Sequence, residues 1–260
     1  AVILAGGRGS RLSEYTDRVP KPLVEIDNFP ILFHIMNTFA IQGVRDFIIL
    51  TGYKGHLVSD FFMNLRSRNG DFEIDLKDGS VRYLSEIQLD WKVTVLDTGI
   101  STMTGGRLLR ARNLLSSDKV FYFTYGDGLA NVNLNSLLTL HQNLGTIATV
   151  TAVLPPSRFG KIKFSNSLAH EFSEKPLSQD DRINGGFFAL TPKIFDYLTD
   201  DSCVFEEEPL SQLARDSELS VYSHNGYWRC MDTLRDLEQI RSDASTVPAP
   251  WLCAEGGKWI

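Results

Sequence analysis

The sequence predicts an α/β fold: a doubly wound, mixed but mostly parallel sheet of the Rossmann-like kind, with a hairpin insertion and a C-terminal helical tail. Three observations support this prediction. Short apolar runs alternate with segments of helical period through the first half of the chain, which favours β-α-β units. A glycine-rich loop follows the first apolar run directly. A segment with alternating apolar residues on both sides of Asp78-Gly79 interrupts the rhythm at residues 71–89.

Buried strands are expected where the first half of the chain has short apolar runs, at residues 1–4, 47–50, 93–96, 120–124 and 147–153. Helices are expected where apolar residues recur every three or four positions, at residues 31–39, 57–65, 105–115 and 133–143. Pro30 suits the first turn of the first of these helices. The order of the elements predicts parallel strands joined by right-handed crossovers.

Residues 71–89 are expected to form an inserted hairpin. Apolar side chains alternate with polar ones on both sides of Asp78-Gly79, a dipeptide typical of tight hairpin turns. Such a hairpin would cover a sheet edge or contact another subunit, and the sequence favours neither role.

The pattern changes after Pro155-Pro156, where shorter strands are expected at residues 161–164, 170–173, 186–190 and 219–223. Helices are expected at residues 192–198, 207–216 and 232–242. The proline-rich tail carries Trp251 and Trp259, which should pack on the body or on a neighbouring subunit. We expect a single domain, residues 1–260, with a candidate boundary near Pro155 between two halves, 1–154 and 155–260, that share one sheet.

The loop at residues 6–11 suits a nucleoside triphosphate. Its glycines allow a tight turn whose N–H groups can bind phosphate, and Arg11 and Lys21 add positive charge nearby. The dinucleotide pattern G-x-G-x-x-G would need glycine where Leu12 stands, and no Gly-Lys pair follows as a P-loop requires.

Charge and composition argue against several classes of protein. A net charge of −6 over 260 residues argues against a nucleic-acid partner. No run approaches the ~20 apolar residues of a membrane helix, so we expect no membrane insertion. The three cysteines lack metal-site spacing and fit a reducing cytoplasm, and the short first apolar run lacks the features of a signal peptide. We therefore expect a cytoplasmic protein.

Two aspartates are candidate metal ligands. Asp127 follows the strand predicted at 120–124, so it should lie at the sheet edge onto which the glycine loop also opens. A carboxylate there suits Mg²⁺, although a turn aspartate is the plainer interpretation. Asp232 precedes a predicted helix, so an N-cap role is its alternative. Arg107 stands in the first turn of a predicted helix, unfavourably for the helix dipole, which suggests that it contacts a ligand.

The string G-G-x-G-S-R-L at residues 6–12, followed by P-K-P at 20–22, resembles the signature of the sugar-1-phosphate nucleotidyltransferases. Ser10 replaces the usual threonine but keeps the hydroxyl. Further strings are most similar to the members that use CTP and glucose 1-phosphate: D-T-G at 97–99, M-T-G-G-R-L at 103–108, F-T-Y-G-D-G at 123–128, P-P-x-R-F-G at 155–160, I-N-G-G-F-F at 183–188 and M-D-T-L-R-D at 231–236. The matches span nearly the whole chain; the departures lie mainly in the hairpin and at residues 177–182.

The resemblance implies cytidylyl transfer from CTP to α-D-glucose 1-phosphate, giving CDP-glucose and pyrophosphate for activated-sugar and surface-polysaccharide (O-antigen) synthesis. It implies Mg²⁺ as cofactor, a homo-oligomer, a nucleotide-binding half at 1–154 and a sugar-phosphate-binding half at 155–260. Asp127 and Asp232 would bind the metal, and Arg11, Lys21, Asp127, Lys175 and Asp232 would carry the catalysis. The nucleotide would contact Leu4, Ala5, Gly6, Gly7, Gly9, Ser10, Arg11, Lys21, Thr104, Gly105, Gly106, Arg107 and Gly126. The sugar phosphate would contact Glu174, Lys175, Asn184, Gly185 and Gly186.

Other functions remain open at this point. Within the same enzyme class, dTTP, UTP or another sugar 1-phosphate would be the substrate. A dinucleotide-dependent oxidoreductase would share the strand-loop-helix start, but Leu12 argues against it. A non-catalytic nucleotide-binding module would have lost the metal carboxylates, and both Asp127 and Asp232 are present.

Overall fold

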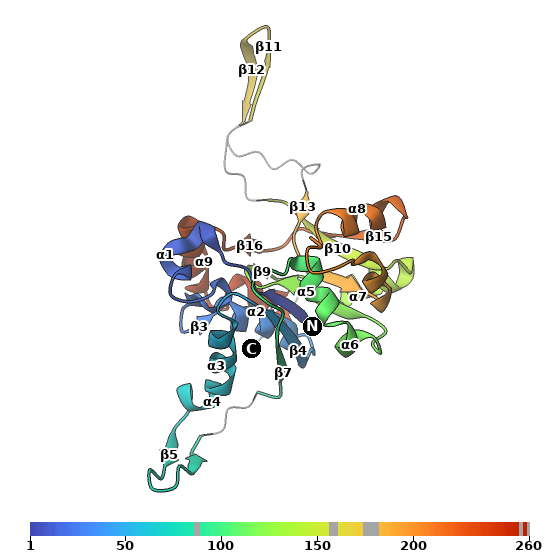
Figure 1. Cartoon of the computed structure of the whole chain (residues 1–260). Coiled ribbons are helices and arrows are strands. Elements are labelled where there is room, and N and C mark those ends of the chain that lie inside the picture. Colours follow the sequence, from blue (N-terminus) through green and yellow to red (C-terminus); the bar gives the residue numbers. More distant parts are fainter. Residues whose placement is uncertain (86–88, 156–160, 174–181, 255–256, 259–260) are drawn as a thin grey trace.

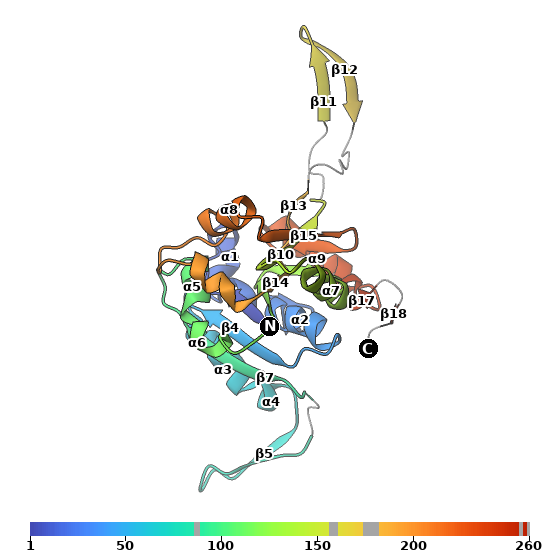
Figure 2. The same ribbon diagram turned by 90° about the vertical axis from the view of Figure 1, so that its right-hand side faces the viewer.

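The centre of the molecule is a mixed eight-stranded sheet, seen in the computed structural model in Figures 1 and 2. The structure describes residues 1–85, 89–155, 161–173, 182–254 and 257–258. The strand order is β13-β10-β14-β8-β1-β4-β7, and β15 pairs with β10. The strands are β1 (Val2–Ala5), β4 (Asp46–Thr51), β7 (Lys92–Asp97), β8 (Phe121–Tyr125), β10 (Ala148–Val153), β13 (Ile183–Asn184), β14 (Phe188–Leu190) and β15 (Leu219–His224). The predicted α/β fold with a mostly parallel sheet is confirmed, since only β13 and β14 run against the other strands.

Alternating side chains of β1 enter two separate cores, one on each face of the sheet. Ile3 and Ala5 face a core to which α2 (Ile31–Ala40), α7 (Leu134–Leu144) and α9 (Leu234–Ala244) contribute. Val2 and Leu4 face the other core, which includes side chains of α5 (Thr104–Arg110), α6 (Arg112–Leu115), α8 (Glu208–Arg215) and the 3-10 helix η3 (Pro192–Tyr197). Burial on both faces explains why the strand is a continuous apolar run.

The remaining elements are short. The helices are η1 (Ser10–Leu12), α1 (Ser13–Thr16), η2 (Lys21–Leu23), α3 (Gly55–Met63), α4 (Leu65–Arg68) and η4 (Pro250–Leu252). Five two-stranded sheets pair β2 (Glu25–Ile26) with β3 (Phe29–Pro30), β5 (Phe72–Ile74) with β6 (Val81–Tyr83), β9 (Gly128–Ala130) with β16 (Trp228–Cys230), β11 (Lys161–Ser165) with β12 (Leu168–Ser173), and β17 (Cys253–Ala254) with β18 (Gly257–Lys258). The predicted inserted hairpin is confirmed as β5–β6, which extends away from the central sheet in Figure 1.

Three local predictions need correction. The helix expected at 105–115 breaks at Ala111, where the backbone leaves helical geometry. The helix expected at 192–198 is a 3-10 helix over Pro192–Tyr197, and Leu198 is already extended. The tail beyond α9 is a short 3-10 turn and the β17–β18 pair rather than helix.

The predicted docking of the tail on the body is confirmed for Trp251, which is buried against His34 and Tyr227. Trp259 lies outside the described residues.

Strands from both sides of Pro155 share the central sheet, because β10 pairs with β13, β14 and β15. The functional division into halves at that point remains a prediction. In the part of the chain that the structure describes, no helix has both the length and the apolar character needed to cross a membrane.

Candidate active site

A pocket lies where β1 and β8 end side by side. The two strands are parallel, with Leu4 opposite Tyr125, so the glycine loop after β1 and Asp127 after β8 emerge at one edge. Ligands bind at this edge of open α/β sheets. The pocket is lined by Leu4, Ala5, Gly7, Gly9, Ser10, Arg11, Lys21, Pro22, Thr104, Tyr125, Gly126, Asp127 and Asp232. The structure thus brings together most of the residues predicted to bind the nucleotide.

Gly9 and Gly126 line the pocket at two points where the backbone lies too close to neighbouring atoms for a side chain. Gly9 has a φ of 61°, and a Cβ there would lie 2.9 Å from Thr16 Cγ2 and 3.1 Å from Lys21 Cβ. The Thr16 hydroxyl donates to the Gly9 carbonyl at 3.1 Å, which fixes the loop against the lysine stem. A Cβ on Gly126 would collide with the Leu4 carbonyl, so only glycine allows β8 to pass β1 this closely.

Pairing between β9 and β16 brings the two aspartates together although they are far apart in sequence. Cys230 lies opposite Gly128, and the Met231 N–H donates to the Asp127 carbonyl at 2.9 Å. The predicted alternative of an N-cap role for Asp232 is wrong. Thr233 caps α9 in a reciprocal capping box with Asp236, so the Asp232 carboxylate is available to the pocket.

Lys21 contacts both carboxylates. Its Nζ lies 2.6 Å from Asp127 Oδ2 and 2.8 Å from Asp232 Oδ1, with 13% of the lysine side chain exposed. Arg11, whose side chain is 75% exposed, lies 3.3 Å from Asp232 Oδ2. Burial alone would lower the pKa of Lys21, but the Asp127 charge and the hydrogen bonds to both carboxylates outweigh it and raise that pKa. The site therefore places two carboxyl groups beside two basic side chains.

The acid pair fits a hard divalent cation. Oxygen atoms of Asp127 and Asp232 and the sulfur of Cys230 lie within 4.8 Å of one another. Mg²⁺ prefers one or two carboxylates together with phosphate oxygens, whereas a thiol is a soft ligand. Burial raises the pKa of the Cys230 thiol, which therefore keeps its proton. The two carboxylates, rather than the thiol, match the requirements of magnesium.

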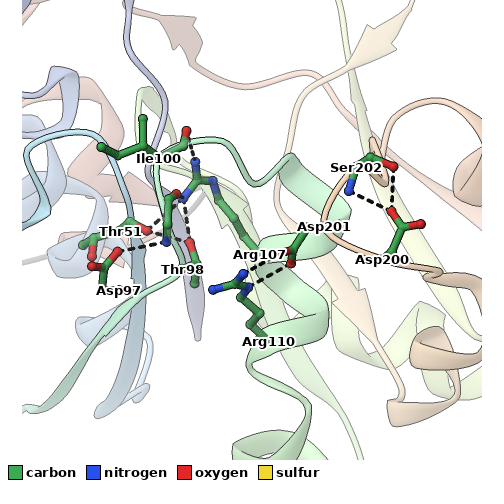
Figure 3. Close-up of polar contacts among 10 residues, drawn as sticks. Thr51, Asp97, Thr98, Ile100, Arg107, Arg110, Asp200, Asp201 and Ser202 are labelled. Carbon is green, nitrogen blue, oxygen red and sulfur yellow. Dashed lines mark hydrogen bonds and ion pairs between the residues drawn. The ribbon is translucent and has the colours of Figure 1, made fainter.

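Arg107 does not line the pocket. It is only 5% exposed, and its guanidinium donates to the Thr51 carbonyl and the Thr98 hydroxyl (Figure 3). It also donates to the carbonyls of Gly99 and Gly6. The dipole argument for a ligand at this arginine therefore fails, because protein oxygens already occupy its donors. Arg107 instead stabilises the glycine loop through its hydrogen bond to the Gly6 carbonyl.

Gly105 and Gly106 also lie away from the pocket. Their N–H groups donate to the Cys203 carbonyl at 2.9 and 3.2 Å. A Cβ on Gly106 would lie 2.6 Å from Asp201 Cα, so the glycines permit close packing of α5 against this segment. Of the predicted string 104–107, Thr104 alone lines the pocket. Figure 3 shows Arg110 on the same helix reaching Asp201.

A second pocket adjoins the first and shares Arg11, Tyr125, Asp127 and Asp232 with it. Its other lining residues are Thr124, Gly128, Ile183, Asn184, Gly185, Glu206, Trp228 and Cys230. The predicted sugar-side residues Asn184 and Gly185 therefore lie beside the carboxylates. Gly186 does not line this pocket, and its φ of 74° serves the turn into β14. Glu174 and Lys175 lie outside the described residues.

Glu206 and Cys230 line the second pocket and were not among the predicted site residues. Glu206 begins a run of three glutamates that looks like a solvated helix start. Cys230 precedes the Met231-Asp232 pair, but its spacing from the other two cysteines is not that of a metal site. Only the folded chain places them next to Tyr125 and the aspartates.

The fold and this site define a nucleotide-binding transferase, and comparison with known proteins agrees. The nucleotidyl transferase family model matches residues 1–246, so the chain belongs to that family. A relative from Salmonella typhi named "glucose-1-phosphate cytidylyltransferase" is 42% identical over 251 residues, covering 96% of this chain and 98% of the relative. A Bacillus subtilis relative named "probable glucose-1-phosphate cytidylyltransferase" is 46% identical over 241 residues, covering 92% of this chain and 94% of the relative.

Solved structures share the fold at low identity. HddC from Yersinia pseudotuberculosis aligns with a TM-score of 0.67 at 20% identity, over 94% of this chain and 98% of its own. The inositol-1-phosphate CTP transferase from T. maritima aligns with a TM-score of 0.65 at 14% identity, over 93% of this chain and 92% of its own.

Proposed function

We propose that this protein transfers a cytidylyl group from CTP to α-D-glucose 1-phosphate, releasing pyrophosphate and forming CDP-glucose for activated-sugar and surface-polysaccharide synthesis. The observation that carries the proposal is the convergence of the glycine loop, Lys21 and two carboxylates at one pocket, in a chain 42% identical to a relative named for this activity. A nucleotide can lie over the loop while a sugar phosphate occupies the adjoining pocket. The two ligands would then meet at Asp127 and Asp232.

The chain's residues act mainly by binding and orientation. The sugar phosphate oxygen attacks the α-phosphorus of CTP in line with the leaving pyrophosphate, so no protein nucleophile is needed. The loop of Gly7, Gly9 and Ser10 accommodates the triphosphate, and Thr104 lines the same pocket. Arg11 and Lys21 neutralise charge on the departing pyrophosphate. Asn184 and Gly185 border the sugar, and Lys175 orients its phosphate.

Asp127 and Asp232 are the proposed ligands of Mg²⁺. When bound, this ion would neutralise phosphate charge and act as a Lewis acid at the α-phosphate. The two aspartates would keep that charge at the boundary between the two pockets, since both carboxylates line both of them.

Two further properties belong to the same proposal. The free thiols of Cys203 and Cys230 support a reducing compartment, the cytoplasm. The exposed apolar side chains of the hairpin β5–β6 support a homo-oligomer.

The test measures pyrophosphate release with Mg²⁺ and glucose 1-phosphate in separate reactions with CTP, UTP, dTTP, ATP and GTP. A strong preference for CTP is expected. Preference for UTP or dTTP would overturn the base assignment and retain the reaction class. No release with any nucleotide, repeated with other sugar 1-phosphates, would contradict the proposal and favour a non-catalytic nucleotide-binding module.

A further inference from the structure

We propose that Glu206 is a positioning residue that couples the nucleotide pocket to the sugar pocket through Thr104 and Tyr125. This inference rests on the proposed function, and it concerns a side chain that sequence motifs did not single out. The carboxylate receives a hydrogen bond on each oxygen. Tyr125 donates to Oε1 at 2.7 Å and Thr104 donates to Oε2 at 2.6 Å.

The two donors border different parts of the site. Thr104 lines the nucleotide pocket, Glu206 lines the sugar pocket, and Tyr125 lines both. The carboxylate therefore connects the two pockets through direct hydrogen bonds from either side. Charge-assisted bonds of this kind are roughly twice as strong as neutral ones, so the three side chains should keep a fixed relative geometry.

The carboxylate also fixes the direction of each hydroxyl. A tyrosine hydroxyl has one proton, and Tyr125 gives it to Glu206, so its oxygen accepts from Asn184 Nδ2 at 3.0 Å. Asn184 Oδ1 in turn accepts from the Gly186 N–H at 2.8 Å, which leaves the amide one orientation.

On the nucleotide side the same argument applies to Thr104. Its hydroxyl proton goes to Glu206, while its oxygen accepts from the Phe205 N–H at 2.9 Å. Toward a ligand this hydroxyl can therefore act only as an acceptor while its proton is held by Glu206. Loss of the carboxylate would free both hydroxyls to rotate.

The segment that carries Glu206 is firmly anchored. The Met103 N–H donates to the Asp201 carbonyl, and Cys203 accepts from the first turn of α5. Phe205 is fully buried, 5.1 Å from the Phe123 ring and 5.4 Å from the Phe188 ring. Glu206 thus follows a fixed point of the core, and its carboxylate sits on a rigid base, as positioning requires.

The experiment compares Glu206→Ala and Glu206→Gln in the full chain, with Glu207→Gln as the matched control because Glu207 is exposed and adjacent. We expect Glu206→Ala to raise the KM for both substrates by about tenfold each, the effect of losing one strong hydrogen bond per pocket. Glutamine keeps one acceptor oxygen, so the KM values of Glu206→Gln should lie between those of Glu206→Ala and of wild type. Glu207→Gln should leave both KM values unchanged.

A coupling measurement separates positioning from a general loss of stability. Thr104→Val should raise the KM for glucose 1-phosphate in the wild-type background, although Thr104 does not line the sugar pocket, and should leave it unchanged in the Glu206→Ala background. Unchanged KM values in Glu206→Ala would overturn the inference. An equal effect of Thr104→Val in both backgrounds would overturn it as well.

Calorimetric titration with CTP and with glucose 1-phosphate distinguishes this inference from the proposed function. A wild-type protein that binds neither ligand contradicts the proposed function. A wild-type protein that binds both, together with a Glu206→Ala variant that binds them equally well, contradicts the coupling role alone.

Discussion

At the scale of single residues, charge balance is the feature that governs the site. Asp127 and Asp232 face Lys21 and Arg11, so the formal charges of the four groups cancel. A divalent cation entering alone would bring two uncompensated charges and would compete with Lys21 for the same oxygens. A nucleoside triphosphate arriving with the metal offsets the metal's positive charge and offers Lys21 new partners. The geometry therefore favours entry of metal and nucleotide together.

Lys21→Met tests this competition. We expect the free protein to bind Mn²⁺ about tenfold more tightly than wild type, because the internal cation is gone, while turnover falls. Electron paramagnetic resonance titration of Mn²⁺ without nucleotide measures the affinity. Lys92→Met, which removes an exposed charge from β7, is the control and should bind Mn²⁺ as wild type does. Equal Mn²⁺ affinity in Lys21→Met and wild type would show that these carboxylates are not the ligands.

Asp127→Asn tests the metal assignment through turnover. The expected result is a fall in kcat of about 100-fold or more, because one charged ligand of the proposed magnesium site is lost. The fold should survive, since Lys21 keeps its partner Asp232. Steady-state pyrophosphate release and circular dichroism measure the two properties, with exposed Asp90→Asn as control. A near-normal kcat would remove Asp127 from the site.

At the scale of elements, one helix start and one strand pair locate Asp232. The β9–β16 pair sets its distance from Asp127, and the capping box of α9 fixes the chain directly after it. Because Thr233 satisfies the helix N-terminus, the Asp232 side chain can turn toward Lys21. The capping box that stabilises α9 thereby determines the direction of the Asp232 side chain, a candidate metal ligand.

Thr233→Ala and Asn133→Ala form a pair for comparison, because the Asn133 side chain also accepts a backbone N–H in the first turn of its helix, α7, away from the pocket. Each substitution should lower the free energy of unfolding by about 1 kcal/mol, the usual worth of such a cap, measured by urea denaturation. Only Thr233→Ala should also raise the Mg²⁺ concentration needed for half-maximal turnover. An unchanged magnesium requirement in Thr233→Ala would mean that the cap does not position Asp232.

At the scale of the whole molecule, the hairpin β5–β6 has too little contact with the body to bury its own side chains. Its exposed apolar residues are Phe72, Ile74, Leu76, Val81 and Leu84, with exposed fractions of 44, 46, 86, 46 and 58%. An isolated two-stranded hairpin is marginally stable in water, and clustered apolar exposure marks interaction sites. These properties support the proposal that the hairpin contacts another copy of this chain.

The double substitution Ile74→Glu with Val81→Glu tests that contact. Multi-angle light scattering after gel filtration should show a smaller assembly than wild type, because two charges would have to be buried in the interface. Leu114→Glu, on α6 and 49% exposed, is the control and should leave the mass unchanged. A wild-type protein that is monomeric at micromolar concentration would contradict the oligomer itself.

Much of the fold follows from local sequence. The buried run Val2–Ala5 and the helical period of Ile31–Ala40 are visible without a structure. A strand buried on both faces is a continuous apolar run, whereas a helix buried on one face has an apolar residue every three or four positions. The hairpin turn at Asp78-Gly79 is equally local. Helix type at residues 192–197 and the break at Ala111 were not predictable, since packing against neighbours decides between closely related backbone geometries.

The sequence by itself determined the class of site. The conformational freedom of a glycine loop indicates phosphate binding, and the charge of carboxylates that follow strands indicates a metal site. Only the tertiary structure decided which side chains meet. It turned Arg107 toward buried carbonyls, joined Lys21 to both aspartates, and brought Glu206 between Thr104 and Tyr125. Arg107 and the Thr51 carbonyl are 56 positions apart along the chain, and Lys21 and Asp232 are 211 positions apart. Contacts over such separations depend on sheet order and packing, which no local pattern encodes.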